Sequence, residues 1–113
     1  MQHPPVTIIL PVFNEVETID GTLTSLIGQD YAGPLDVIVA DGGSTDGTLE
    51  KLEGWASAAP NVTVIDNNRR VQSYGLNAAA EASDAPLLVR ADGHTHYAPD
   101  YVRQSVNTVI ETG

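Results

Sequence analysis

Four short apolar runs recur along the chain, each followed by a segment whose apolar residues have helical spacing. The runs are rich in β-branched residues and mostly continuous, which is typical of strands buried on both faces. They predict strands over residues 6–10, 35–40, 62–65 and 87–91. The chain therefore contains four candidate strands separated by candidate helices.

Apolar residues three and four positions apart predict four helices. Asn14 with Glu17 predicts a variant capping box for the first helix, and Pro99 is placed to open the last. The order βαβαβαβα predicts an α/β fold with a parallel sheet, helices on both faces and right-handed crossovers. The helical stripes are formed by Val16, Ile19, Leu23, Leu26 and Ile27; Leu49, Leu52 and Ala56; Val71, Tyr74, Ala78 and Ala82; and Val102, Val106, Val109 and Ile110.

Composition limits the classes of ligand. The chain has 113 residues, with 15 acidic residues against 5 Lys and Arg and a net charge of -10. This length favours one domain, and this charge argues against nonspecific binding of nucleic acid or anionic membranes. A phosphorylated ligand would need a cation, helix N-termini or a few placed arginines. The absence of cysteine excludes disulfides and thiolate metal sites.

The two ends of the sequence indicate a partial domain without a leader. The start MQHPPV has neither a basic segment nor a long apolar one, so we predict no signal peptide, and no apolar run reaches the length of a membrane span. The sequence ends within a helical pattern that another strand should follow. We expect a cytoplasmic protein, and a place at the cytoplasmic face of the inner membrane stays open for a longer parent chain.

Polar motifs follow all four predicted strands. In open parallel sheets, ligands bind beyond the carboxyl ends of the strands. The motifs are PVFNE at residues 11–15, DGGSTDGT at 41–48, DNNRR at 66–70 and DGHTH at 92–96. We therefore predict one binding edge.

The glycine-rich second motif has two interpretations. Its glycines would let the backbone approach a ligand, and Asp41 could accept hydrogen bonds from a base or ribose; alternatively the motif is a tight turn with a helix N-cap. The first strand lacks a dinucleotide-binding glycine motif, and no P-loop is present. A receiver domain is disfavoured because no acidic pair follows the first strand.

The last motif carries candidate metal chemistry. Asp92, His94 and His96 alternate, so in an extended stretch they would point the same way. A carboxylate with imidazole suits Mn, Fe or Zn, but the histidines could also be surface residues. Arg69 and Arg70 could hold a diphosphate or form a solvated pair. We interpret Arg90 as a paired structural charge and Trp55 and Tyr101 as packing residues, and the role of Tyr97 stays open.

Over essentially its whole length the sequence resembles the family 2 inverting glycosyltransferases of the GT-A fold. The segments IILPVFNE, VIVADGGSTDGT, RRVQSYGLNAAAEAS and LLVRADGHTHYAPDYV follow the order and approximate spacing of that family. The last segment looks like the succinoglycan-biosynthesis branch, in which DxH replaces DxD. The resemblance implies a Rossmann-like three-layer α/β/α fold with a mostly parallel sheet, incomplete at its C-terminus, with residues 1–113 as the donor-binding portion.

The resemblance also implies roles for individual residues. Asp41 would bind the base, expected to be uracil, and Arg70 would approach the base or the diphosphate. Gly75 and Asn77 match a G-x-N motif near the nucleotide. The remaining implied positions are Pro11, Phe13 and Glu15 in the nucleotide pocket, Asp92 on the ribose or sugar, and Asp92 with His94 at a divalent metal, Mn or Mg.

The implied reaction is transfer of a hexose from a nucleotide-diphosphate sugar, expected to be a UDP-sugar, to an acceptor hydroxyl with inversion, in exopolysaccharide biosynthesis. The acceptor would be a saccharide or a lipid-linked molecule. No nucleic acid partner is expected. The general base is expected after Gly113, as are any membrane segments. Two alternatives remain: a nucleotide-binding module without transfer chemistry, and an iron site built from Asp92, His94 and His96, which the parallel sheet disfavours.

Overall fold

The computed structural model describes residues 3–66, 87–93 and 95–112. Strands and helices alternate along the described chain, and the helix predicted over residues 71–82 lies outside it. The elements are β1 (Val6–Val12), α1 (Ile19–Ile27), β2 (Leu35–Asp41), α2 (Thr48–Ala58), β3 (Val62–Asp66), β4 (Leu87–Arg90) and α4 (Tyr101–Thr112).

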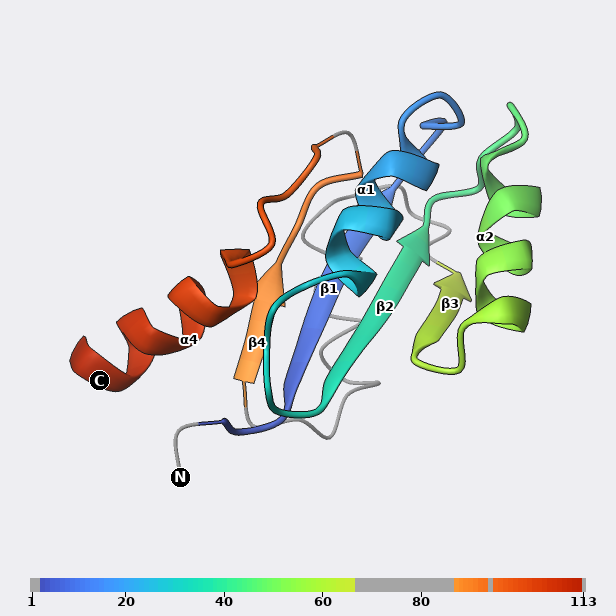
Figure 1. Cartoon of the computed structure of the whole chain (residues 1–113). Coiled ribbons are helices and arrows are strands. Elements are labelled where there is room, and N and C mark those ends of the chain that lie inside the picture. The colour runs from blue at the N-terminus through green and yellow to red at the C-terminus, as the bar shows by residue number, and fades with distance from the viewer. Residues whose placement is uncertain (1–2, 67–86, 94, 113) are drawn as a thin grey trace.

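The four described strands form one parallel sheet in the order β3-β2-β1-β4, which confirms the predicted α/β fold. Central β1 pairs with β2 from Val6 opposite Leu35 to Val12 opposite Asp41, and it pairs with β4 along its other side. Because all strands run in one direction, their carboxyl ends lie at one edge of the sheet (Figure 1). Strand bounds differ from the predicted ones by one or two residues at that edge.

The central strands β1 and β2 are buried on both faces of the sheet, as predicted, whereas the edge strand β4 alternates and leaves Leu88 47% exposed. Ile8 and Leu10 of β1 join Leu23 of α1 in the main core cluster, and all three are fully buried. Ile9 points to the opposite face, where it packs with Ile38 of β2. Full burial of each such side chain contributes about 1.5–3 kcal/mol relative to exposure.

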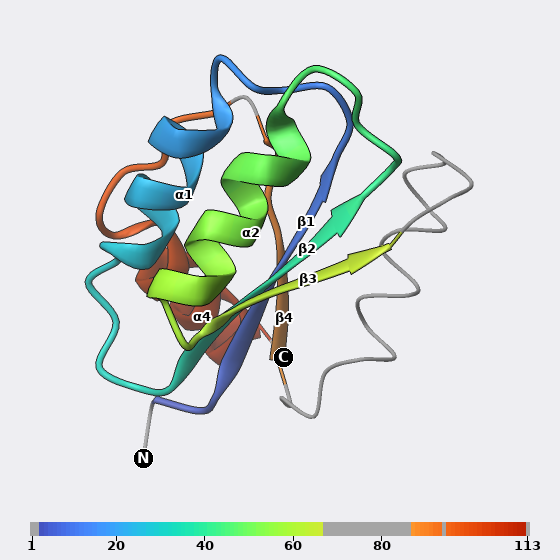
Figure 2. The same ribbon diagram turned by 90° about the vertical axis from the view of Figure 1, so that its right-hand side faces the viewer.

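The helices α1 and α2 cover one face of the sheet (Figure 2). Helix α4 adds Val102 and Val106 to the same core cluster, and both are buried. Trp55 and Tyr101 pack against this cluster, which confirms their prediction as packing residues. Tyr97 packs there too, so its apolar body is structural.

The predicted capping box at Asn14 is wrong. Helix α1 begins only at Ile19, and its N-cap Thr18 makes no side-chain cap bond. Asn14 instead lies in the loop before the helix with a φ of 51°, in the left-handed region. Its side chain bonds to a neighbouring loop, a long-range contact that local spacing does not encode. Pro99 lies two residues before α4 rather than in its first turn.

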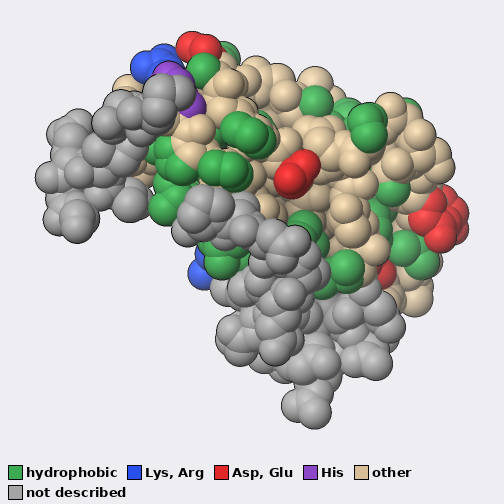
Figure 3. Space-filling model, turned by 90° about the horizontal axis from the view of Figure 1, so that it is seen from below, with side chains coloured by type: hydrophobic (Ala, Val, Ile, Leu, Met, Phe, Trp, Pro, Cys, Tyr) green, Lys and Arg blue, Asp and Glu red, His purple; other side chains and the backbone are tan. Residues whose placement is uncertain are grey.

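The amino ends of the strands lie at the other end of the molecule, which Figure 3 shows from below. Described side chains on this face are mainly apolar or uncharged, and the acidic ones stand apart from one another. The polar motifs of the sequence therefore gather away from this face, at the carboxyl edge.

Candidate functional site

The carboxyl edge brings together three described loops. They follow β1, β2 and β4, and they carry the motifs PVFNE, DGGSTDGT and the first part of DGHTH. The predicted convergence of these three motifs on one edge is confirmed. Most of the DNNRR motif after β3 lies outside the described residues.

Side chains of the second loop hold the backbone of the first. Three successive N–H groups, those of residues 14–16, donate to side-chain oxygens across the gap. In return, Oδ1 of Asn14 accepts the N–H of Thr45 at 2.8 Å. The three acceptors are Ser44 Oγ at 2.9 Å, Thr48 Oγ1 at 2.9 Å and Asp46 Oδ2 at 3.3 Å. We call this set the loop clasp.

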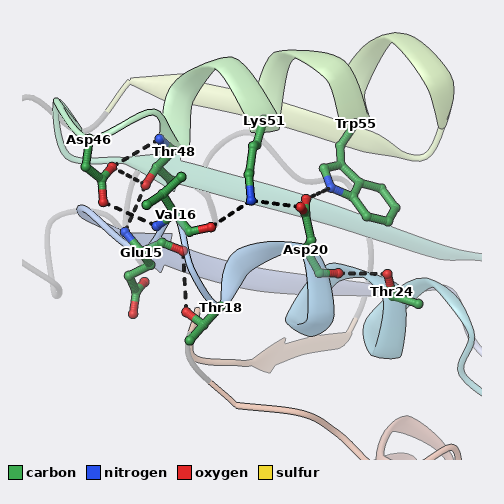
Figure 4. A network of polar contacts seen from close by, with 9 residues as sticks. All are labelled: Glu15, Val16, Thr18, Asp20, Thr24, Asp46, Thr48, Lys51 and Trp55. Atoms are coloured by element: carbon green, nitrogen blue, oxygen red, sulfur yellow. Dashed lines mark hydrogen bonds and ion pairs between the residues drawn. The ribbon is translucent and has the colours of Figure 1, made fainter.

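The loop clasp continues into an ion pair between α1 and α2 (Figure 4). Lys51 Nζ donates to the carbonyl of Val16 at 2.8 Å and lies 2.9 Å from Oδ2 of Asp20. The Trp55 indole N–H donates to the other oxygen of Asp20 at 2.9 Å. These two donors, the indole first, hold the pKa of Asp20 below its usual value.

Within the clasp, Asp46 also organises the start of α2. Its Oδ1 accepts the N–H of Thr48 at 3.1 Å and the Thr48 hydroxyl at 2.5 Å. The Thr48 hydroxyl lowers the pKa of Asp46. Gly47 precedes the helix with a φ of 105°, a conformation that glycine adopts without strain.

Asp41 is buried at the end of β2, with 4% of its surface exposed. Its Oδ2 accepts the N–H groups of Gly43 and Ser44, each at 3.1 Å, and its Oδ1 accepts the Ser44 hydroxyl at 2.6 Å. The motif therefore forms a tight turn, while the N-cap residue of α2, Gly47, makes no side-chain cap bond. The carboxylate also lines an open pocket of about 460 Å³ with Gly43, Leu49, Glu53, Val64 and Ile65.

Asp92 and Gly93 follow β4 and lie against the first loop. The Asp92 side chain is 43% exposed, and its Oδ1 lies 3.9 Å from Nη2 of Arg90, so Arg90 is paired as predicted. The Asp92 N–H donates to the Tyr97 hydroxyl at 2.7 Å. Gly93 is buried beside Val12 and the carboxylate of Glu15, with no room for a Cβ. This contact places Glu15 beside the segment that carries Asp92.

The predicted site residues are thus only partly brought together. Glu15, Asp41 and Asp92 stand at the carboxyl edge, with Pro11 near the end of β1 and the ring of Phe13 40% exposed beyond it. Among the described residues, no three His, Cys, Asp or Glu side chains are grouped to hold a metal. Predicted residues outside the described part are Arg69, Arg70, Gly75, Asn77 and His94.

Sequence reasoning missed the loop clasp. Ser44, Asp46 and Thr48 act on the backbone of residues 14–16, although the motif alone suggested ligand contacts or a local turn. The available signal was the density of hydroxyl and carboxylate groups directly before α2. Such groups accept backbone N–H bonds readily, but nothing in the sequence names the partner.

A parallel sheet with its polar loops at the carboxyl edge is an open α/β domain, and comparison with solved structures identifies it as the GT-A type. A solved mannosyltransferase, PcManGT from Pyrobaculum calidifontis in complex with GDP-Man and Mn2+, superposes with a TM-score of 0.80 at 32% identity. The match covers 95% of this chain and 32% of that one. TarS of S. aureus has the same TM-score at 22% identity, which supports the fold alone.

The chain belongs to glycosyl transferase family 2, whose sequence profile matches residues 7–113. The succinoglycan biosynthesis protein ExoA of Rhizobium meliloti is 37% identical over 110 residues, 94% of this chain and 33% of that protein. The glycosyltransferase AglE of Haloferax volcanii is 31% identical over 97% of this chain and 37% of its own length. This chain thus spans about a third of these curated relatives.

In the described part of the chain, no helix is both long and apolar enough to cross a membrane.

Proposed function

We propose that this chain is the donor-binding part of a glycosyltransferase that uses a nucleotide-diphosphate sugar. The observation that carries the proposal is the placement of Glu15, Asp41 and Asp92 at the carboxyl edge of a family 2 domain. A UDP-sugar is the proposed donor, and a GDP-sugar is the competing one because PcManGT was solved with GDP-Man. Inverting transfer to a saccharide or lipid-linked hydroxyl is proposed for the whole protein.

Asp41 is the proposed base-binding group. It is buried, and its two oxygens accept three hydrogen bonds within its own loop. A carboxylate offers about four acceptor sites, so capacity remains for one N–H of a base. The loop holds the carboxylate in place before the ligand arrives, which reduces the entropy lost on binding. Phe13, exposed directly after β1, offers an apolar surface at the same edge of the sheet.

A divalent metal is proposed because a chain with a net charge of -10 repels a diphosphate, and a bound cation would offset this repulsion. Asp92 supplies an exposed carboxylate, and His94 follows two positions later in the sequence. Oxygen with imidazole nitrogen is a donor set that suits Mn²⁺ better than Mg²⁺, so these residues fit a bound Mn²⁺. When bound, the metal would neutralise charge on the leaving diphosphate. Arg70 and Asn77 are proposed on the nucleotide from the family resemblance alone.

Titration with UDP and GDP, each with and without Mn²⁺, tests the proposal by calorimetry. We expect Mn²⁺-dependent binding of one nucleotide, preferably UDP. Asp41→Ala should weaken it about tenfold, since a hydrogen bond to a charged group contributes about 1.5–3 kcal/mol. His94→Ala should weaken it to a similar degree by removing a proposed ligand of the metal. Asp36→Ala, an exposed aspartate near the start of β2, should bind like the wild type.

The outcomes separate the competing functions. Binding that ignores the metal, with no sugar transfer by the whole protein, would favour a nucleotide-binding module without transfer chemistry. If neither UDP nor GDP binds, with or without Mn²⁺, the proposed donor site is wrong.

A further inference from the structure

Helix α1 presents two different stripes to its surroundings. Its apolar stripe, which includes Ile19, Leu23 and Leu26, is fully buried in the core. A second, polar stripe has the spacing i, i+4, i+7 and i+11, which keeps its members on one side of a helix. It consists of Thr22 and Ser25 within α1, Thr18 at its N-cap and Gln29 two residues after its last residue, Ile27. Thr22 is 2% exposed and Ser25 is 9% exposed.

All four members of the polar stripe bond to the segment after β4, which runs beside α1 in both ribbon views (Figures 1 and 2). Two hydroxyls, from Thr18 and Thr22, donate to the same carbonyl, that of Gly93, at 2.9 and 3.1 Å. The remaining contacts run from Tyr97 N–H to Ser25 Oγ at 2.9 Å, from Gln29 Nε2 to the Ala98 carbonyl at 2.7 Å, and from Val102 N–H to Gln29 Oε1 at 2.7 Å.

Among the contacts of the polar stripe, those on the Gly93 carbonyl lie nearest to Asp92 in the sequence. Gly93 is buried, and a buried carbonyl without partners costs about 1–3 kcal/mol. Here two hydroxyls occupy both of its lone pairs. This carbonyl lies in the peptide that follows Gly93, one residue beyond Asp92, so holding it restrains the backbone next to Asp92.

A second contact closes the segment on itself. The Asp92 N–H donates to the Tyr97 hydroxyl, while the Tyr97 N–H is held by Ser25 of the polar stripe. The described residues from Asp92 to Ala98 belong to no helix or strand. Side-chain contacts, rather than a backbone ladder, therefore set the orientation of Asp92.

We propose that the polar stripe of α1 is a positioning device for the metal and donor group Asp92, with the paired hydroxyls of Thr18 and Thr22 on the Gly93 carbonyl as its main element. This inference rests on the proposed donor site. It adds the residues that hold the acidic group in place without touching the ligand. Thr22 is the better test position because it is the more deeply buried of the two threonines.

Thr22→Val tests this role, since it removes the hydroxyl and preserves the branched shape. Thr24→Val is the matched control: Thr24 lies on the same helix, is exposed, and its hydroxyl donates to the Asp20 carbonyl one turn earlier at 2.7 Å. Thr22→Ser restores a hydroxyl. Two measurements are made on each variant. The first is amide hydrogen exchange over residues 92–98. The second is the affinity for Mn²⁺ in the presence of UDP, measured by electron paramagnetic resonance of Mn²⁺.

We expect faster exchange at Asp92 and Tyr97 in Thr22→Val and an affinity for Mn²⁺ lowered about tenfold, in the range known for residues that orient metal ligands. Thr24→Val should match the wild type, and Thr22→Ser should recover most of the affinity. Faster exchange with unchanged Mn²⁺ affinity would make the stripe purely structural and overturn the positioning role, as would equal behaviour of the two valine variants. If the wild type binds neither Mn²⁺ nor UDP, the donor site itself is wrong and this inference falls with it.

Discussion

At the scale of single residues, Gly93 is the tightest point of the site. A Cβ at this position would lie 2.8 Å from Cγ1 of Val12 and would collide with the carboxylate of Glu15. The Glu15 carboxylate can swing aside, but Val12 is buried in the sheet. The absence of a side chain at position 93 therefore lets the segment with Asp92 approach β1 closely.

Gly93→Ala should lower the free energy of unfolding by about 1–3 kcal/mol, because overpacking a buried position forces backbone shifts. Urea unfolding followed by circular dichroism measures the change. Gly54→Ala is the control: a Cβ there meets nothing within 4 Å, and the site is inside α2. That variant should gain about 0.5–1 kcal/mol. A Gly93→Ala chain as stable as the wild type would show that the segment is free to move.

Ser44 links two loops through one hydroxyl. It accepts the Asn14 N–H at 2.9 Å and donates to Asp41 at 2.6 Å. Ser44→Ala should cost about 1 kcal/mol, because the buried carboxylate of Asp41 loses a donor and the Asn14 N–H loses its acceptor. Ser57→Ala, at an exposed position inside α2, should be neutral or slightly stabilising because alanine is the better helix former. Equal stabilities for the two variants would contradict a structural role for the loop clasp.

At the scale of elements, α1 and α2 are joined through Asp20. The indole N–H of Trp55 and the ammonium group of Lys51 keep the pKa of Asp20 below its usual 3.8 in the folded chain. A lowered folded pKa contributes stability that is present above the unfolded value and is lost as the pH falls through the folded value. The helix pair should therefore weaken in acid.

Asp20→Asn should reduce the loss of stability between about pH 5 and about pH 3, because the variant has no carboxylate to protonate at this position. Urea unfolding at a series of pH values measures the slope. Trp55→Phe retains an aromatic ring but removes the N–H donor, and it should flatten the same part of the curve. An Asp20→Asn curve parallel to the wild-type curve would show that this contact adds nothing to folding.

Local pattern predicts the strands well because each is a short, mostly continuous apolar run. Strand β1 pairs with β2 from Val6 to Val12 and with β4 from Val6 to Ile9. The local pattern also places the polar motifs at one edge, since parallel direction alone dictates that. It fails at Asn14, whose side chain bonds to Thr45, 31 positions away. The apolar spacing predicts α1 but not its polar stripe, whose partner, the segment after β4, is brought to it only by the folding of the chain.

At the scale of the whole molecule, the net charge and the proposed metal site have opposite effects on a diphosphate ligand. Fifteen acidic residues repel one another and any diphosphate, whereas a bound divalent cation at Asp92 would make the carboxyl edge locally attractive. Acidity of this degree disfavours nonspecific binding of anions, so the proposed donor would depend on the proposed metal and on arginines near it. The same repulsion acts on the folded chain itself, where it opposes compaction.

Salt should therefore stabilise this chain at neutral pH. Raising NaCl from about 0.1 M to about 1 M shortens the Debye length from about 10 Å to about 3 Å, which screens repulsion among exposed carboxylates. The midpoint of thermal unfolding should rise at pH 7, where the net charge is -10. The control is the same titration near the isoelectric point of 4.3, where repulsion is small and the rise should nearly vanish. An equal rise of the midpoint at both pH values would assign the effect to exclusion of salt from apolar surface. A fall of the midpoint at pH 7 would mean that ion pairs such as Lys51 with Asp20 outweigh the net repulsion.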